Sequence, residues 1–222
     1  MAEKYGVVPK RFTKAWWSYF WMYYKWHTIA TAFVVLCIGV TVRQCVTAPK
    51  YDLTVTYAGG YALGEETENK FTEILTEYTE DINKNGESLP YFQPLVISDN
   101  QEDAQYNYAM QTKLMLEFQN DNSFLFILDK SMADAMINGE AYSGVFAPAS
   151  DWTNSELTDD DVIKDSDGTA RAVSLKDSAV LKNAQIPCDD LYIAVKLNGK
   201  DDEENTAAFE NSKKIADTLI SK

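Results

Sequence analysis

Histidine is almost absent from this chain of 222 residues, and the one histidine, His27, lies near the N-terminus. The rest of the sequence therefore lacks the imidazole that Ser-His-Asp catalysis, Cys-His catalysis and most zinc sites require. Cysteine is nearly as scarce. Cys37 and Cys45 fall in the apolar N-terminal region, and Cys188 stands alone after it. This placement excludes a disulfide framework, and we expect Cys188 to be a buried thiol.

Basic residues are also few beyond the N-terminal region. Residues 48–222 contain 14 lysines and arginines against 33 acidic residues, a formal net charge of −19. A surface with this charge repels nucleic acid and anionic headgroups, so the sequence predicts no nucleic-acid partner. It suits a cationic partner, or simply solubility near a charged envelope.

Long apolar runs are limited to one, the 15 uncharged residues from Thr28 to Val42. A hydrocarbon core needs about 20 helical residues. Apolar neighbours supply the remainder, and Lys25 and Arg43 can extend their charged ends to the headgroups while their stems stay buried. The run therefore predicts a transmembrane helix over residues 27–46. A buried core helix and a cleaved signal peptide are the alternatives.

Aromatic side chains crowd the segment before this run. Trp and Tyr favour the membrane interface, where the ring is apolar and its polar end stays hydrated. We therefore expect residues 1–26 to form a basic, aromatic arm at the interface. The tryptophans expected to lie there are Trp16, Trp17, Trp21 and Trp26.

The charges around the run predict its orientation. Five basic residues and one acidic residue precede it. Positively charged flanks stay in the cytoplasm, so the N-terminus is expected inside the cell. Residues 47–50 then form a short stalk, and residues 51–222 form a single domain outside the cell membrane. We expect one membrane crossing, with lipid contacted through this helix alone.

The outer region alternates between period-two and helical apolar patterns. This alternation predicts an α/β fold, a three-layer α-β-α domain with a mostly parallel sheet. The helix predicted over residues 103–118 is expected to bury Tyr108, Leu114, Met115 and Phe118. Ser131 is expected to cap the helix that follows the central apolar strand. The predicted strands are 51–58, 95–97, 124–128, 170–174 and 191–195, and the predicted helices are 65–82, 103–118, one beginning at 131, one or two turns within 177–183, and 205–221.

Two chain positions are candidates for contact with a ligand. Gly59-Gly60-Tyr61 follows the first strand, and Asp129 follows the central apolar strand. In open α/β sheets ligands bind beyond the carboxyl ends of strands, so these residues are expected to face a cleft. Trp152 could supply an aromatic wall. A purely structural role in turns and core is the alternative for each of them.

A partial calcium loop lies between residues 81 and 86. Asp81, Asn83 and Asn85 supply oxygens at the first, third and fifth positions, and Gly86 occupies the sixth. The twelfth position, where an EF-hand has a bidentate acid, is Phe92. The turn after a helix explains the same residues, and we expect neither a metal nor a cofactor.

The stretch from Lys113 to Asp129, with a K-L-x-x-x-F helix end, a turn and an apolar strand, resembles bacterial extracellular solute-binding proteins of the type II periplasmic-binding fold. The similarity covers residues 51–150. Members of that family are roughly twice as long, because two lobes close on the ligand. The resemblance therefore implies one lobe of such a protein, tethered to a bacterial cell membrane.

Together these patterns predict a non-catalytic binding or interaction module whose partner is a protein or a small solute. Abundant carboxylates leave a tethered hydrolase as a second hypothesis. An accessory subunit of a membrane transporter, whose anchor packs against other membrane helices, is a third.

Overall fold

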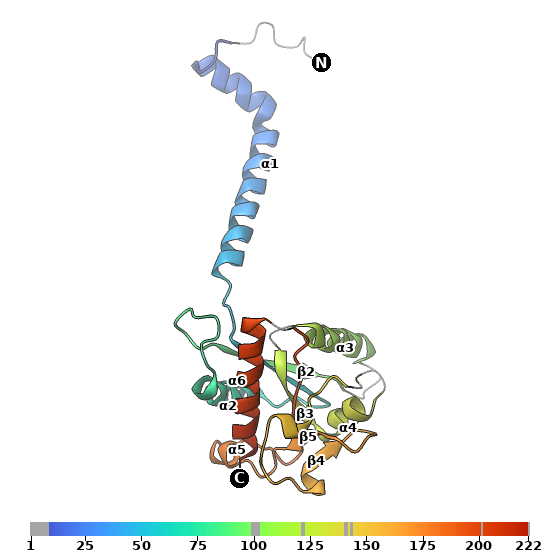
Figure 1. The fold of residues 1–222 in the computed structure, drawn as a ribbon. Coiled ribbons are helices and arrows are strands. Elements are labelled where there is room, and N and C mark those ends of the chain that lie inside the picture. Colours follow the sequence, from blue (N-terminus) through green and yellow to red (C-terminus); the bar gives the residue numbers. More distant parts are fainter. Residues whose placement is uncertain are drawn as a thin grey trace. The chain divides into compact units, whose positions relative to one another are not determined.

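The computed structural model describes residues 9–98, 103–120, 123–139, 142, 144–200 and 202–221. The chain divides into two compact units, Met1–Pro49 and Lys50–Lys222. Each unit has its own architecture (Figure 1).

The first unit is dominated by helix α1 (Lys14–Thr47), whose 34 residues include the whole apolar run. Thr13 caps it, because its hydroxyl accepts a hydrogen bond from the Trp16 amide at 3.2 Å. At 1.5 Å per residue the helix is about 51 Å long. It has no buried residue, and its most apolar part has a mean hydropathy of 2.0. Among the described residues this is the one helix long and apolar enough to cross a membrane.

The second unit is built on a six-stranded sheet in the order β2-β1-β3-β6-β5-β4. The central strands are buried along their whole length, as expected where both faces of a sheet are covered. The strands are β1 (Leu53–Gly59), β2 (Pro90–Val96), β3 (Ser123–Asp129), β4 (Val162–Lys164), β5 (Ala170–Ser174) and β6 (Leu191–Val195).

The expected mostly parallel sheet is wrong. Among the described strands, β1 pairs in parallel with β2 and β3, whereas β3–β6, β6–β5 and β5–β4 are antiparallel. A parallel neighbour needs a crossover of a dozen or more residues. Only residues 165–169 join β4 to β5, which forces a hairpin. Between β5 and β6 lies α5 (Ala179–Asn183), which is too short to return the chain to the opposite edge of the sheet.

Helices cover both faces of the sheet, as the three-layer prediction required. One face packs against α2 (Glu65–Tyr78), α5 and α6 (Glu203–Ile220), and its core includes Val55, Phe71 and Ile215. The other face packs against α3 (Ala104–Gln119) and α4 (Lys130–Asn138), around Phe126 and Met136. Figure 1 shows α2 and α6 on the side of the unit away from α3 and α4.

Several details depart from the sequence predictions. On α3, Leu114 is buried and Phe118 partly buried, but Tyr108 and Met115 point to solvent. Helix α4 begins earlier than expected, and its cap is Asp129 rather than Ser131. The sequence did not predict β4, which has three residues, or the first half of β2, whose two prolines weaken a strand pattern.

Candidate functional site

The parallel strands and β5 end at one edge of the sheet, which we call the carboxyl edge. At this edge Asp129, at the end of β3, lies against the Gly59-Gly60 pair at the end of β1. The Gly60 amide donates to Asp129 Oδ2 at 2.6 Å. A side chain at position 59 would overlap the Tyr57 hydroxyl and approach Asp129 Oδ2 to 2.9 Å, so this close approach requires glycine.

The second Asp129 oxygen is also occupied. Asp129 Oδ1 accepts a hydrogen bond from the Met132 amide at 2.7 Å, which caps α4. The side chain is only 4% exposed. Asp129 therefore joins the end of β1 to the start of α4. The sequence pattern found this residue and its neighbours Gly59 and Gly60, but the hydrogen bonds describe a structural joint.

Two tyrosines complete this edge. The buried Tyr57 hydroxyl donates to the Tyr61 carbonyl at 2.7 Å, and Tyr61 itself is exposed. Burial raises the pKa of the Tyr57 phenol far above its usual value, and the negative charges nearby, including Asp129 and Asp190, add to the shift. Burial likewise raises the pKa of Tyr61, with Asp190 as the next cause. Both phenols therefore stay neutral at physiological pH and can act as hydrogen-bond donors.

Trp152 does not join this group. It is buried in the core layer beneath α2, α5 and α6, directly after the short 3₁₀ turn η4 (Ala149–Asp151). Within the described part of the chain its indole nitrogen has no hydrogen-bond partner. The structure thus brings together four of the five residues suggested as ligand-facing, Gly59, Gly60, Tyr61 and Asp129, and packs Trp152 in the core.

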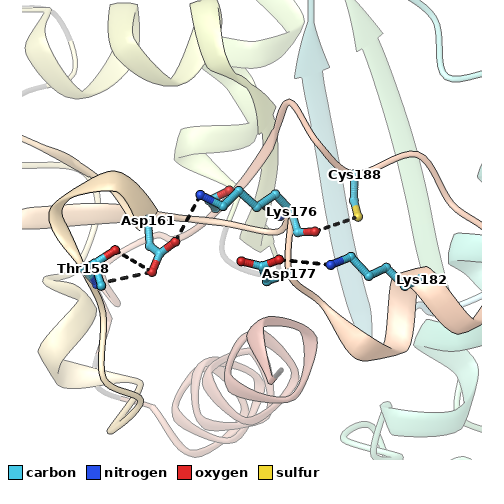
Figure 2. Close-up of polar contacts among 7 residues, drawn as sticks. Thr158, Asp161, Lys176, Asp177, Lys182 and Cys188 are labelled. Carbon is cyan, nitrogen blue, oxygen red and sulfur yellow. Dashed lines mark hydrogen bonds and ion pairs between the residues drawn. The ribbon is translucent and has the colours of Figure 1, made fainter.

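A polar network continues along the carboxyl edge (Figure 2). The buried Asp161 accepts from the Thr158 hydroxyl at 2.9 Å and lies 3.5 Å from Lys176 Nζ. Asp177 pairs with Lys182 at 3.0 Å. These contacts fasten the turn η5 (Asp159–Asp161) and α5 to the end of β5. The Asp177–Lys182 pair is largely exposed and contributes little, so the buried Asp161 is the contact that stabilises this edge of the sheet.

Cys188 lies beside this network, where its thiol approaches the Lys176 carbonyl at 3.9 Å. Burial raises the pKa of the thiol, and the adjacent Asp189 raises it further. The reactive thiolate is therefore disfavoured. The buried, unpaired thiol expected from the sequence is confirmed.

A hollow of about 530 Å³ lies elsewhere, between the C-terminal end of α4 and the β4–β5 hairpin. Arg171 forms part of its wall. Its Nε donates to Asp165 Oδ2 at 2.8 Å, and its Nη1 donates to the Phe146 carbonyl at 2.7 Å. The described lining is Ile137, Asn138, Gly139, Tyr142, Gly144, Phe146, Asp165, Ser166, Asp167 and Arg171.

The hollow has the volume of a small-molecule site, but its lining is more polar than that of most such sites. Clefts that hold such ligands span about 300–1,000 Å³ and combine apolar walls with a few polar groups. Here Ile137 and Phe146 are apolar, whereas Asn138, Tyr142 and Ser166 offer hydrogen bonds. Sequence reasoning missed this place, because its residues come from α4 and a hairpin that are far apart along the chain.

The partial calcium loop is stabilised by its own backbone. Asp81 accepts from the Asn85 and Gly86 amides, and Asn85 accepts from the Glu87 amide. The buried Asp52, which the sequence did not single out, supports the loop by accepting from the amides of residues 82, 83 and 89. Within the described residues no group of three or more His, Cys, Asp or Glu side chains is placed to hold a metal ion.

Comparison of the chain with protein-family models, with characterised proteins and with solved structures finds no match.

Proposed function

We propose that this protein is a single-pass membrane protein that displays its α/β unit outside the cell and works by binding. The observation that carries the proposal is α1. None of its apolar side chains is buried along a helix of 34 residues. Exposed apolar surface on this scale is unfavourable in water, and lipid tails would cover it.

The length and aromatic content of α1 support an interfacial arm before the span. A spanning helix of about 20 residues covers a hydrocarbon core, so roughly a dozen residues of α1 extend beyond it. In this N-terminal part Trp16 stacks on Phe20, and Phe20 stacks on Tyr24, with ring centroids 5.4 and 5.5 Å apart. Figure 1 shows that the helix bends in this part. A bent, aromatic segment suits the headgroup region, where such rings prefer to lie.

The basic residues before the span place the N-terminus in the cytoplasm under this proposal. The acidic unit of residues 50–222 then faces the exterior. Asp129 is poorly suited to act as a general acid or base, because backbone amides engage both of its oxygens. A general acid or base needs an oxygen within reach of a substrate.

Anchoring is tested by alkaline extraction of membranes that carry the full chain. The native protein is expected to stay in the pellet. The double variant Val35→Arg/Ile38→Arg is expected to shift largely to the supernatant, because each arginine near the helix centre costs about 3 kcal/mol of insertion. Ser18→Arg, in the interfacial part of α1, is the matched control and should stay in the pellet. A native chain found in the supernatant would contradict the proposal.

The hollow beside Arg171 is where a small polar ligand would bind. The full chain in detergent, screened by thermal shift against amino acids, sugars and short peptides, is expected to gain stability with at least one class. Ser166→Trp, which fills the hollow from the exposed hairpin turn, should abolish the gain. Ser155→Trp, at an exposed position away from the hollow, should keep it. A ligand that stabilises the Ser166→Trp variant equally would show that binding occurs elsewhere.

A further inference from the structure

The outer face of α3 carries large apolar side chains that the described residues of the unit leave exposed. Tyr108 is 74% exposed, and Met115 and Leu116 are each 57% exposed. Tyr106 adds a further exposed ring at the start of the helix. A single exposed leucine would be ordinary, but several large apolar side chains on one helix indicate a contact surface.

This face is also free of charge. The two charged residues of α3 are Lys113, which is partly buried, and Glu117, which is buried. Every exposed residue of the helix is uncharged. The exposed faces of α2 and α6, in contrast, carry acids such as Glu73, Glu77 and Glu210. An uncharged helix face within a region of net charge −19 is where a second acidic body can approach with least repulsion.

The exposed residues of α3 follow the spacing of a helix–helix seam. Gln105, Tyr108, Thr112, Met115 and Gln119 recur at alternating intervals of three and four, the spacing that places side chains against a neighbouring helix. Leu116 widens the same stripe. The seam suits another helix packed lengthwise along α3.

Five of the six seam positions are symmetric about Thr112, and the sixth, Met115, mirrors Ala109. Gln105 and Gln119 lie seven residues either side of it, and Tyr108 and Leu116 lie four either side. Two antiparallel copies of α3, related by a two-fold axis at Thr112, would therefore pair glutamine with glutamine and Tyr108 with the partner's Leu116. A two-fold interface requires such self-complementarity, because one patch must fit itself.

The helix is held firmly enough to present this face. Leu114 is buried beneath it. At its C-terminal end the buried Lys196 ammonium donates to the carbonyls of Asn120, Phe118 and Glu117 at 2.5, 3.3 and 3.4 Å. Near its N-terminal end the Asn107 side chain bonds both the amide and the carbonyl of Ser98. The seam is therefore an ordered surface.

We infer that two copies of this chain associate through antiparallel α3 helices, with Thr112 on the two-fold axis. The uncharged seam lets the two acidic units meet, and its symmetry selects a second copy rather than an unrelated helix. The inference goes beyond the proposed function, because the seam belongs to the α/β unit and does not depend on the membrane orientation.

Disulfide crosslinking of the full chain in detergent tests this geometry. A two-fold axis at position 112 brings the two substituted residues within disulfide range. In a Cys37→Ser/Cys45→Ser background, Thr112→Cys is expected to form a covalent dimer at least tenfold faster than Thr76→Cys. The control is closely matched. Thr76 is an exposed threonine on α2, and its hydroxyl donates to the carbonyl four residues earlier, as that of Thr112 does.

A third variant tests whether the crosslink depends on the seam or forms by random collision of two chains. Adding Leu116→Glu to Thr112→Cys places like charges in the seam and should lower the crosslinking rate to that of the Thr76→Cys control. Equal rates for Thr112→Cys and Thr76→Cys, or no effect of Leu116→Glu, would overturn the inference. A native chain that sediments as a monomer at tens of micromolar would also overturn it. Crosslinking in native membranes to a different protein would assign the seam to that protein instead.

Discussion

Arg171 and Asp165 form the pair of charged residues that shapes the hollow. Each side chain is mostly buried, and the guanidinium also donates to the Phe146 carbonyl. The Arg171 hydrogen bond holds the pKa of the Asp165 carboxyl below its usual range, with the Thr169 amide as the next cause. The ionised carboxylate is therefore favoured in the folded state. Losing the Asp165 carboxylate should weaken both the β4–β5 hairpin and the wall of the hollow.

The pH dependence of stability tests this pair. A depressed pKa contributes stability that is present above the unfolded value, about 3.9, and is lost as the pH falls through the folded value. Asp165→Asn should therefore lower the midpoint of urea unfolding clearly at pH 7. This gap, the difference in midpoint between the variant and the native chain, should shrink below about pH 4. Asp167→Asn, in the same turn, has no ion pair with a described residue and should show no such gap. A gap for Asp165→Asn that is constant from pH 7 to pH 3 would contradict this role.

At the residue scale, the sequence predicts which residues lie at the carboxyl edge better than it predicts what each of them does there. Gly59, Gly60, Tyr61 and Asp129 were each expected to face a cleft beyond the strand ends, and the structure brings them together at one edge of the sheet. That Asp129 would spend both oxygens on backbone amides could not be predicted, since it depends on how α4 begins. Arg171 and Lys196 had no local signal. Their partners lie far away along the chain, and only the folded sheet brings them together.

At the scale of a single element, helix α3 shows which contacts decide the face that a helix turns to the sheet. Its apolar residues surround the helix instead of forming one stripe, so the sequence could not decide which would face the sheet. The structure buries Leu114 and leaves Tyr108 and Met115 outside. The orientation is set at the C-terminal end, where Lys196 on the strand side holds the last carbonyls of the helix. A cation at a helix C-terminus is favourable, since the macrodipole is negative there.

Replacing Lys196 by Met tests this anchoring of α3. The change keeps most of the side-chain volume but leaves partly buried carbonyls without their charged donor, which should cost about 1–3 kcal/mol of unfolding free energy. Amide exchange should accelerate in α3 more than in α6. Lys50→Met, at an exposed position before β1, is the control and should change neither. A Lys196→Met chain with native stability and native exchange in α3 would show that the helix is held by its apolar contacts alone.

The links between elements explain why the prediction of a mostly parallel sheet was wrong. The first half of the α/β unit alternates strand, helix and strand, so its parallel pairings were predictable. The second half has short links between strands, and residues 165–168 form a hairpin turn. The partner of the late strand, residues 191–195, could not be predicted, because its register against β3 exists only in the folded sheet.

For the whole molecule, two units of opposite character share one chain. One is an apolar helix with a basic, aromatic start. The other has a closed core on both faces of its sheet and a strongly acidic surface. Composition alone predicted this division, and the contact pattern places the boundary after Pro49. The division could be predicted because the apolar run and the acidic remainder differ so strongly in composition.

Site-directed labelling in intact cells tests anchoring and orientation together. In a Cys37→Ser/Cys45→Ser background, a membrane-impermeant maleimide should label Ser155→Cys, in the α/β unit, without permeabilisation. It should label Ser18→Cys, in the N-terminal part of α1, only after the membrane is opened. The opposite pattern would reverse the orientation, and labelling of neither site before lysis would contradict display outside the cell.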